Sequence, residues 1–305
     1  MQAVDVVIPT YKPDHKLRSL LQYLAAQTYP VQKVIIMNTE QKYWPTQLEE
    51  ERYPFSLEVH HISRDEFDHG ATRDRGIRYS SAPYVLLMTQ DAVPFDNQLV
   101  DGLLLGFDNP MIAVTYARQL ANPGSAPLEQ FTRNFNYPEE SRVKKHSDLA
   151  TLGIKTYFCS NVCAMYRRSV YDELGGFIKK TIFNEDMIFA SNVIKAGYEI
   201  HYVATARVYH SHDYTALEQF HRNFDLGVSQ ADHPEVFEEV PSEAEGKKLV
   251  KMSAEFLKDE GQSSKILNLY WVSGWKYLGY RMGKAYKKLP KWLIKKCSMN
   301  RKYFE

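Results

Sequence analysis

Glycine is missing from the first 69 residues of this 305-residue chain, since the first one is Gly70. A dinucleotide-binding fold needs the pattern G-x-G-x-x-G after its first strand, and a P-loop needs G-x-x-x-x-G-K-[ST]. Neither pattern can be formed by residues 8–13, which follow the first apolar run. The sequence therefore disfavours a Rossmann oxidoreductase and a P-loop kinase.

Cysteine and long apolar runs are also scarce. Cys159, Cys163 and Cys297 are an odd number at spacings that fit neither a disulfide framework nor a zinc site, which favours a reducing compartment. The start of the chain has no charged leader with an apolar segment, so we expect no secretory signal. The apolar stretch at 266–275 ends at Lys276, short of the ~20 residues that span a bilayer. We expect a cytoplasmic protein.

The body of the chain has no excess of positive charge. Lys and Arg number 38 against 37 Asp and Glu, but residues 276–305 alone carry a net +9, which leaves −8 for the other 275 residues. Duplex binding depends on clustered basic residues that neutralise phosphates. An acidic body of this kind argues against nucleic acid as a partner.

Apolar runs and helical spacings alternate along the first part of the chain. Strands are predicted at 3–8, 31–37, 57–62 and 84–88, and helices at 16–27 and 69–80. This alternation predicts an α/β fold with a mostly parallel sheet flanked by helices.

The second part gives a weaker pattern. Residues 118–155 are polar, contain three prolines and predict a long loop or lid over a site. Helices are predicted at 165–174, where Gly175 and Gly176 end the helix, and at 186–196, 215–230 and 242–258, with a strand at 199–204. The tail is predicted to be helical from residue 265 to Pro290 at least. We expect one domain over 1–230, with halves at 1–117 and 118–230, and a helical C-terminal region over 231–305.

Five separated elements resemble the family 2 glycosyltransferases with the GT-A fold. They are Val6-Val-Ile-Pro-Thr-Tyr11, His69-Gly-Ala-Thr-Arg-Asp74, Gln90-Asp-Ala92, Gly175-Gly-Phe177 and Asn184-Glu-Asp186. The segments 67–73, 89–94 and 209–212 are most similar to bacterial rhamnosyltransferases, which use dTDP-L-rhamnose. The resemblance implies inverting transfer of a sugar to a hydroxyl of a glycan or lipid-linked saccharide in cell-surface polysaccharide synthesis.

In this family a D-x-D motif after a strand binds a divalent cation that bridges the donor diphosphate. Asp91 occupies the second acidic position, whereas Thr89 replaces the first acid. We therefore expect His210 or His212 to complete the ligands, and imidazole suits Mn²⁺ better than Mg²⁺. The alternatives are a turn-forming acid for Asp91 and ordinary surface or core histidines.

Asp186 is the residue that the resemblance implies as the catalytic base. Inverting transfer needs a group that takes the proton of the acceptor hydroxyl, while the nucleoside diphosphate leaves from the other face. Glu185 is expected to orient the site, and Gly175 and Gly176 are expected on the acceptor side. Because the acids open a helix, an ordinary capping role stays open.

The remaining candidates are expected to bind the donor. Thr10 and Tyr11 follow the first strand, and Asn38 replaces the Asp with which the family holds the base. Arg73 has the guanidinium geometry that suits a diphosphate, although an exposed helix arginine is the alternative. The full set of predicted donor contacts is Pro9, Thr10, Tyr11, Asn38, Asp68, His69, Arg73 and Gln90, and Asp68 has a helix cap as an equally good explanation.

Two further hypotheses remain for the activity. A transferase of the same family that uses a UDP-hexose is one, and a non-catalytic scaffold that binds a nucleotide sugar is the other. Thr89 and Asn38 favour the scaffold, whereas Asp91, Asp186 and the glycine pair favour an enzyme.

The tail suggests a partner without help from the family. Three of the four tryptophans lie between 270 and 292, among tyrosines and basic residues. This composition is typical of a helix in a membrane interface, so residues 270–302 are expected to contact an anionic surface at the inner face of the cell membrane. Packing on the catalytic domain or on a second subunit of a homodimer is the alternative.

Overall fold

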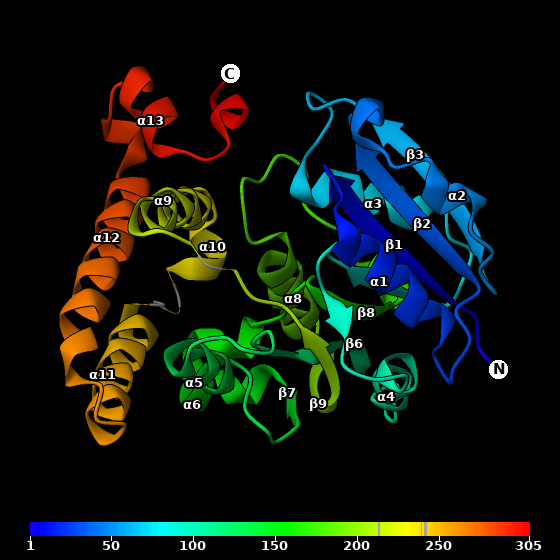
Figure 1. The fold of residues 1–305 in the computed structure, drawn as a ribbon, viewed down its shortest axis with the longest axis horizontal. Coiled ribbons are helices and arrows are strands. Elements are labelled where there is room, and N and C mark those ends of the chain that lie inside the picture. Colours follow the sequence, from blue (N-terminus) through cyan, green and yellow to red (C-terminus); the bar gives the residue numbers. More distant parts are fainter. Residues whose placement is uncertain (213, 239, 241–242) are drawn as a thin grey trace.

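A computed structural model describes residues 1–212, 214–238, 240 and 243–305. Its sheet has the strand order β3-β2-β1-β4-β8-β6-β9-β5, with β7 paired to β9 (Figure 1). The strands are β1 (Val4–Tyr11), β2 (Lys33–Thr39), β3 (Ser56–Ile62), β4 (Tyr84–Met88), β5 (Val93–Pro94), β6 (Ile112–Leu120), β7 (Arg142–Lys144), β8 (Cys163–Arg167) and β9 (Glu199–Tyr209).

The first four strands confirm the expected parallel α/β arrangement. β1 pairs in parallel with both β2 and β4, and β2 pairs in parallel with β3. The second half is mixed, because β8 pairs antiparallel with β4 and β6, whereas β6 and β9 are parallel. The predicted α/β class is thus confirmed, with a sheet that changes direction at β8.

Helices cover the sheet where apolar spacing predicts them. α1 (His15–Ala25) buries four leucines, and Asp14 caps it by accepting a hydrogen bond from the backbone N–H of Lys16. The other helices are α2 (Gln47–Glu50), α3 (His69–Arg78), α4 (Leu99–Leu105), α5 (Pro127–Asn136), α6 (Leu149–Leu152), α7 (Arg168–Glu173), α8 (Glu185–Lys195), α9 (Ala216–Asp232), α10 (Pro234–Phe237), α11 (Glu243–Asp259), α12 (Ile266–Lys284) and α13 (Lys291–Cys297). Short 3-10 turns occupy Gln41–Tyr43, His146–Asp148, Gly153–Tyr157, Ser263–Lys265, Tyr286–Lys288 and Arg301–Phe304.

Two predictions for the middle of the chain are wrong. Residues 165–174 are not one helix, because β8 runs through Arg167 and α7 begins only at Arg168. The apolar residues of β8 are buried between β4 and β6. The spacing of apolar residues in so short a segment does not distinguish a buried strand from a buried helix. Residues 118–155 are not a long loop either, since they contain the end of β6, α5, β7 and α6.

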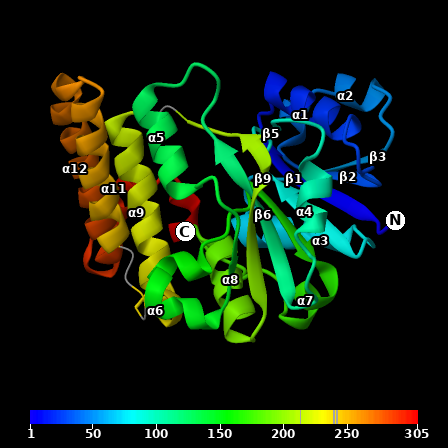
Figure 2. The same cartoon turned by 90° about the horizontal axis from the view of Figure 1, so that it is seen from below.

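The C-terminal helices form a layer beside the sheet (Figures 1 and 2). α12 packs on α9 at very short range, because a Cβ atom added to Gly283 would lie 2.1 Å from the backbone oxygen of Phe224. The predicted helices at 215–230 and from 265 onward are confirmed as α9 and α12. The helix predicted at 242–258 is α11, and residue 242 lies outside the described residues.

None of the helices in the described ranges is long and apolar enough to cross a membrane.

Candidate active site

The ends of β1, β2 and β4 bring several predicted donor contacts together. Thr10 pairs with Asn38 in the register of β1 and β2, beside the pair of Pro9 and Met37. Gln90 follows β4 and clamps the backbone of Tyr11, accepting from its N–H at 2.9 Å and donating to its carbonyl at 3.1 Å. This clamp holds the exposed Tyr11 ring at the edge where ligands of α/β folds bind.

Asn38 lies one layer behind this edge. It is fully buried, and its amide oxygen accepts a hydrogen bond from the Thr10 hydroxyl at 3.0 Å. Its amide nitrogen lies 3.0 Å from Nδ1 of His61 and donates to the carbonyl of Glu40. In this arrangement Asn38 orients Thr10, and its direct contact with a nucleobase stays a prediction.

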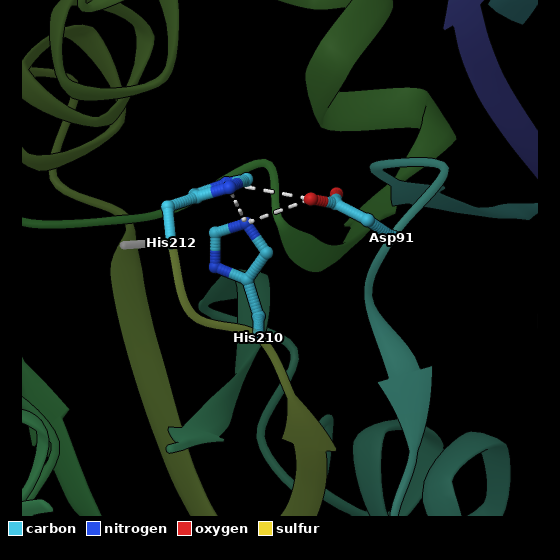
Figure 3. A group of neighbouring side chains, drawn as sticks. All are labelled: Asp91, His210 and His212. Carbon is cyan, nitrogen blue, oxygen red and sulfur yellow. Dashed lines mark hydrogen bonds and ion pairs between the residues drawn. The ribbon is translucent and has the colours of Figure 1, made fainter. Parts of the chain in front are cut away.

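Asp91, His210 and His212 form a compact cluster, in which all three side chains point toward one another (Figure 3). Oδ2 of Asp91 lies 3.7 Å from Nε2 of His210 and 3.3 Å from Nε2 of His212, and the two Nε2 atoms are 3.0 Å apart. The carboxylate comes from the turn after β4 and the imidazoles from the segment after β9. One carboxylate and two imidazoles converging in this way are a suitable ligand set for a divalent cation.

The tautomer of His210 fits this interpretation. Oε1 of Gln119 accepts a hydrogen bond from Arg133 at 2.9 Å and lies 3.0 Å from Nδ1 of His210. Because an amide oxygen only accepts, Nδ1 must carry the proton and Nε2 must present its lone pair to the cluster. Burial lowers the pKa of His210 to about 3, which keeps the ring in the neutral form that binds metals.

The acid pair opens α8. Asn184 precedes it in the left-handed conformation, with φ of 66°, and its side-chain amide donates to the hydroxyl of Ser229 on α9. The same hydroxyl donates to the carbonyl of Phe183 at 2.7 Å. These two bonds anchor the first turn of α8 to α9 and stabilise a backbone conformation that few non-glycine residues adopt.

Glu185 is the buried, charged member of the pair. Its Oε1 lies 3.2 Å from Nη1 of Arg73 and accepts a hydrogen bond from the side-chain amide of Asn161 at 3.2 Å. Burial opposes ionisation, but the charge of Arg73 and the other polar neighbours outweigh it and lower the pKa of Glu185. Arg73 is buried as well, which excludes the alternative of an exposed helix arginine. Its role at a diphosphate stays a prediction.

The pKa of Asp186 shifts in the opposite direction to that of Glu185. Its two carboxylate oxygens accept backbone N–H bonds, from Asn161 at 3.0 Å and from Met187 at 2.8 Å. Burial nevertheless raises the pKa of Asp186 to about 7, and the negative charge of Glu185 adds to the shift. A carboxylate with a pKa near neutrality is suited to exchange a proton with a substrate under physiological conditions.

A segment that the sequence did not single out connects the cluster of Asp91, His210 and His212 to the acid pair. Ser160 accepts a hydrogen bond from Gln119, Asn161 bonds both acids, and the carbonyl of Val162 accepts from the backbone of Thr89. Tyr166 fixes the side chain of Asn161 by donating to its amide oxygen at 2.7 Å. The only signal in the sequence was two polar residues, 160 and 161, before an apolar run.

The other predicted residues lie around the acid pair. Asp68 caps α3 by accepting from the N–H of Ala71, and its second oxygen accepts from Thr181 in the loop before α8. The capping explanation is thus realised, and a sugar contact stays a prediction. His69 follows it and contacts Phe183, which also precedes the acids.

Gly175 and Gly176 end α7 with φ of 80° and 72°. A Cβ atom on Gly176 would lie 2.6 Å from a carboxylate oxygen of Asp74, so this turn requires glycine on both conformational and steric grounds. The turn directs the chain toward Phe177, whose N–H donates to the hydroxyl of Tyr171. The predicted contact of the glycines with an acceptor is not tested by this geometry.

Two relatives cover most of the chain. The O-antigen chain rhamnosyltransferase RfbN of Salmonella typhimurium is 34% identical over 99% of this chain and 96% of its own length. The O-antigen chain rhamnosyltransferase WbaN of Salmonella anatum is 37% identical over 80% of this chain and 78% of its own length.

Solved structures support the fold. The Mannosyltransferase PcManGT from Pyrobaculum calidifontis, in complex with GDP-Man and Mn²⁺, has a TM-score of 0.58 at 13% identity and matches 99% of this chain and 85% of its own. S. aureus TarS 1-349, in complex with UDP-GlcNAc, has a TM-score of 0.54 at 15% identity over 94% and 92% of the two chains. The family model described as "Glycosyl transferase family 2" matches residues 5–175. This match, together with the two relatives, shows that the chain belongs to the family 2 glycosyltransferases.

Proposed function

We propose that the protein transfers L-rhamnose from dTDP-L-rhamnose, with inversion, to a hydroxyl of a glycan or lipid-linked saccharide during synthesis of a cell-surface polysaccharide. The names of RfbN and WbaN support the sugar and the pathway class. The observation that carries the chemistry is the acid pair, in which Asp186 has a pKa of about 7 beside a charged Glu185.

Asp186 acts as the general base in this proposal. Its carboxylate takes the proton of the acceptor hydroxyl as the acceptor oxygen bonds to the anomeric carbon, and the bond from that carbon to the nucleoside diphosphate breaks on the opposite face. Glu185 stays charged through its pairing with Arg73 and thereby keeps the proton affinity of Asp186 high. Asn161 holds the two acids in place.

Asp91, His210 and His212 would hold a divalent cation, and Mn²⁺ is favoured over Mg²⁺ because two of the three groups are imidazoles. A bound cation at this position supplies positive charge to the diphosphate leaving group. The hydrogen bond between Gln119 and His210 orients one ligand. The exposed Tyr11 at the ends of the strands offers a ring to the nucleotide.

A donor screen tests the proposed sugar. The protein is incubated with dTDP-L-rhamnose, UDP-glucose, UDP-galactose or GDP-mannose, each with Mn²⁺ or Mg²⁺, and the released nucleotide is measured. We expect dTDP-L-rhamnose to turn over fastest, and the Asp186→Asn variant serves as the control for release that does not need the base. Faster turnover of a UDP-hexose would favour the alternative transferase activity. Binding of a donor without turnover of any would favour the scaffold.

A further inference from the structure

The outer face of α12 is apolar, although it points away from the rest of the protein. Figures 1 and 2 both place α12 at the outer edge of the molecule. Large apolar side chains on this face are exposed by about half or more: Leu267 by 80%, Tyr270 by 53%, Trp271 by 62%, Tyr277 by 47% and Leu278 by 48%. Their spacing of three, four and seven residues puts them on one side of the helix.

The opposite face of α12 is already used. Gly279 and Gly283 lie against the backbone oxygens of Phe220 and Phe224 on α9, so closely that an added Cβ would be 2.2 Å or 2.1 Å away. The exposed stripe therefore cannot become buried by rotation of α12, because that would break the contact with α9. An apolar stripe that a folded helix holds outward is a feature of interaction surfaces.

Positive charge follows the C-terminal end of this stripe. Residues 265–305 contain eleven Lys or Arg and a single acidic residue, Glu305, which pairs with Lys295. Lys288, Lys291 and Lys296 are exposed and lie within four residues of the exposed Trp292 in the sequence, and none of the three forms an ion pair in the described part of the chain. The basic residues thus border the aromatic residues at the C-terminal end of α12 and along α13.

We propose that this docking face, made of the outer side of α12 together with α13, lies in the interface of an anionic lipid membrane. Aromatic and aliphatic side chains enter the boundary between headgroups and acyl chains, and the lysines contact the anionic headgroups. A second copy that docks through the same face fits less well, because it would bring the same basic residues, and Glu305, the single acid of residues 265–305, already pairs with Lys295. The charge of the face is complementary to a lipid surface.

The docking face is also joined firmly to the acid pair. α12 packs on α9, and Ser229 of α9 bonds both Phe183 and Asn184, which directly precede Glu185. Farther along the tail, Tyr303 contacts the carbonyl of Lys180 in the same loop. A protein bound through this face would hold the acid pair in one orientation relative to the membrane, which suits an acceptor attached to a lipid.

Co-sedimentation of the full chain with vesicles tests the proposal. The vesicles contain phosphatidylcholine alone, or three parts phosphatidylcholine to one part phosphatidylglycerol, each at low and high salt. We expect binding to the mixed vesicles that weakens at high salt. Binding is expected to fall at least about tenfold in Tyr270→Ser/Trp271→Ser, because these rings supply apolar area at the interface.

A charge variant and a control complete the experiment. Lys288→Gln/Lys291→Gln/Lys296→Gln is expected to bind roughly a hundredfold more weakly at low salt, since each basic residue near an anionic surface contributes about fivefold. Tyr23→Ser/Arg52→Gln removes an exposed ring and a cation from the other end of the molecule and should bind like the original protein. All substituted side chains are exposed, and equal melting temperatures would verify that the variants are folded.

The proposal would be overturned if the original protein did not bind the mixed vesicles, or if Tyr270→Ser/Trp271→Ser bound them as well as the original protein does. It would also be overturned if the control variant lost as much binding as the charge variant. Sedimentation of the protein without lipid tests whether a second copy of the chain occupies the face. A dimer that Tyr270→Ser/Trp271→Ser converts to a monomer would assign the face to a second copy. Vesicle binding does not depend on the sugar donor, so this test and the donor screen fail independently.

Discussion

Replacing Asp186 by Asn separates the chemical role of this side chain from its structural role. The amide keeps the shape of the carboxylate but cannot take a proton, and general base catalysis contributes about 10² to 10⁴ in rate. We therefore expect turnover to fall by that factor, which corresponds to roughly 3 to 5 kcal/mol of transition-state stabilisation. Donor affinity should hardly change, because within the described residues Asp186 bonds to Asn161 and Met187 rather than to the strand-end residues.

The same substitution should remove a loss of stability that the original protein suffers as the pH rises. The pKa of Asp186 is about 7 in the folded protein, against an ordinary value of 3.8, so the folded state holds a proton that the unfolded state has lost. Stability attributable to this group is lost as the pH rises from about 4 to about 7, and each pKa unit corresponds to about 1.4 kcal/mol. Asp186→Asn removes this pH-dependent loss, but its amide nitrogen cannot accept one of the two backbone N–H bonds that the carboxylate accepts. The melting temperature of the variant should therefore rise relative to that of the original protein between pH 5 and pH 8.5.

Two measurements check these expectations: nucleotide release at saturating donor, as in the donor screen, and thermal unfolding at pH 5, 7 and 8.5. Asp259→Asn, an exposed carboxylate at the end of α11, is the matched control and should change neither quantity. Retention of most of the turnover by Asp186→Asn would refute the assignment of the base and make Glu185 the next candidate. A difference in melting temperature between the variant and the original protein that is the same at pH 5 and at pH 8.5 would refute the electrostatic reasoning.

Glu185→Gln should move the acidic limb of the pH profile of kcat/KM to lower pH, because the charge of Glu185 raises the pKa of Asp186. A limb that stays at the same pH or moves to higher pH would contradict this. Chelation with EDTA should abolish turnover, and added Mn²⁺ should restore it. Gln119→Leu should weaken Mn²⁺ binding about 10- to 100-fold in a titration, because this variant loses the hydrogen bond that orients His210. Gly283→Val should lower the melting temperature by several degrees, because the new side chain collides with α9, whereas Gly274→Ala, which meets open space, should not.

The elements that the sequence predicts well are those whose signals are local. β4 covers residues 84–88 as expected, since an unbroken apolar run of this length between turns is typical of a strand buried on both faces. Asp68, for which the sequence offered a capping role, caps the helix that follows it. Capping depends on two or three neighbouring residues, which is why it can be predicted from one sequence.

The elements that it predicts poorly depend on distant partners. β8 is a strand because β4 and β6 lie on either side of it, and those partners are separated from it by some 50 residues or more of chain. α5 is stabilised in part by the stacking of Phe131 on Phe256 of α11, with ring centroids 4.6 Å apart. Neither contact leaves a mark in the local pattern around the element that it stabilises.

The candidate site divides along the same line. The resemblance predicted Asp91 together with His210 or His212, and the structure brings all three side chains together. Gln119 and Asn161 were not predicted, because their importance comes from hydrogen bonds to His210 and to the acids rather than from a sequence pattern. Residues that orient a site are recognisable only when the fold has brought them beside it.

Thr89 is where the sequence departs from the D-x-D pattern, and the structure gives this departure a physical meaning. The backbone N–H of Thr89 donates to the carbonyl of Val162, which ties the end of β4 to the segment that holds the acid pair. The charge that a carboxylate at this position would supply is missing, but two imidazoles from the segment after β9 converge on Asp91 instead. Neutral imidazoles add donor atoms without adding negative charge, so a cation in this cluster would keep more of its charge for a diphosphate. The altered motif is therefore compatible with catalysis through a different ligand set, and it weakens the argument for a non-catalytic scaffold.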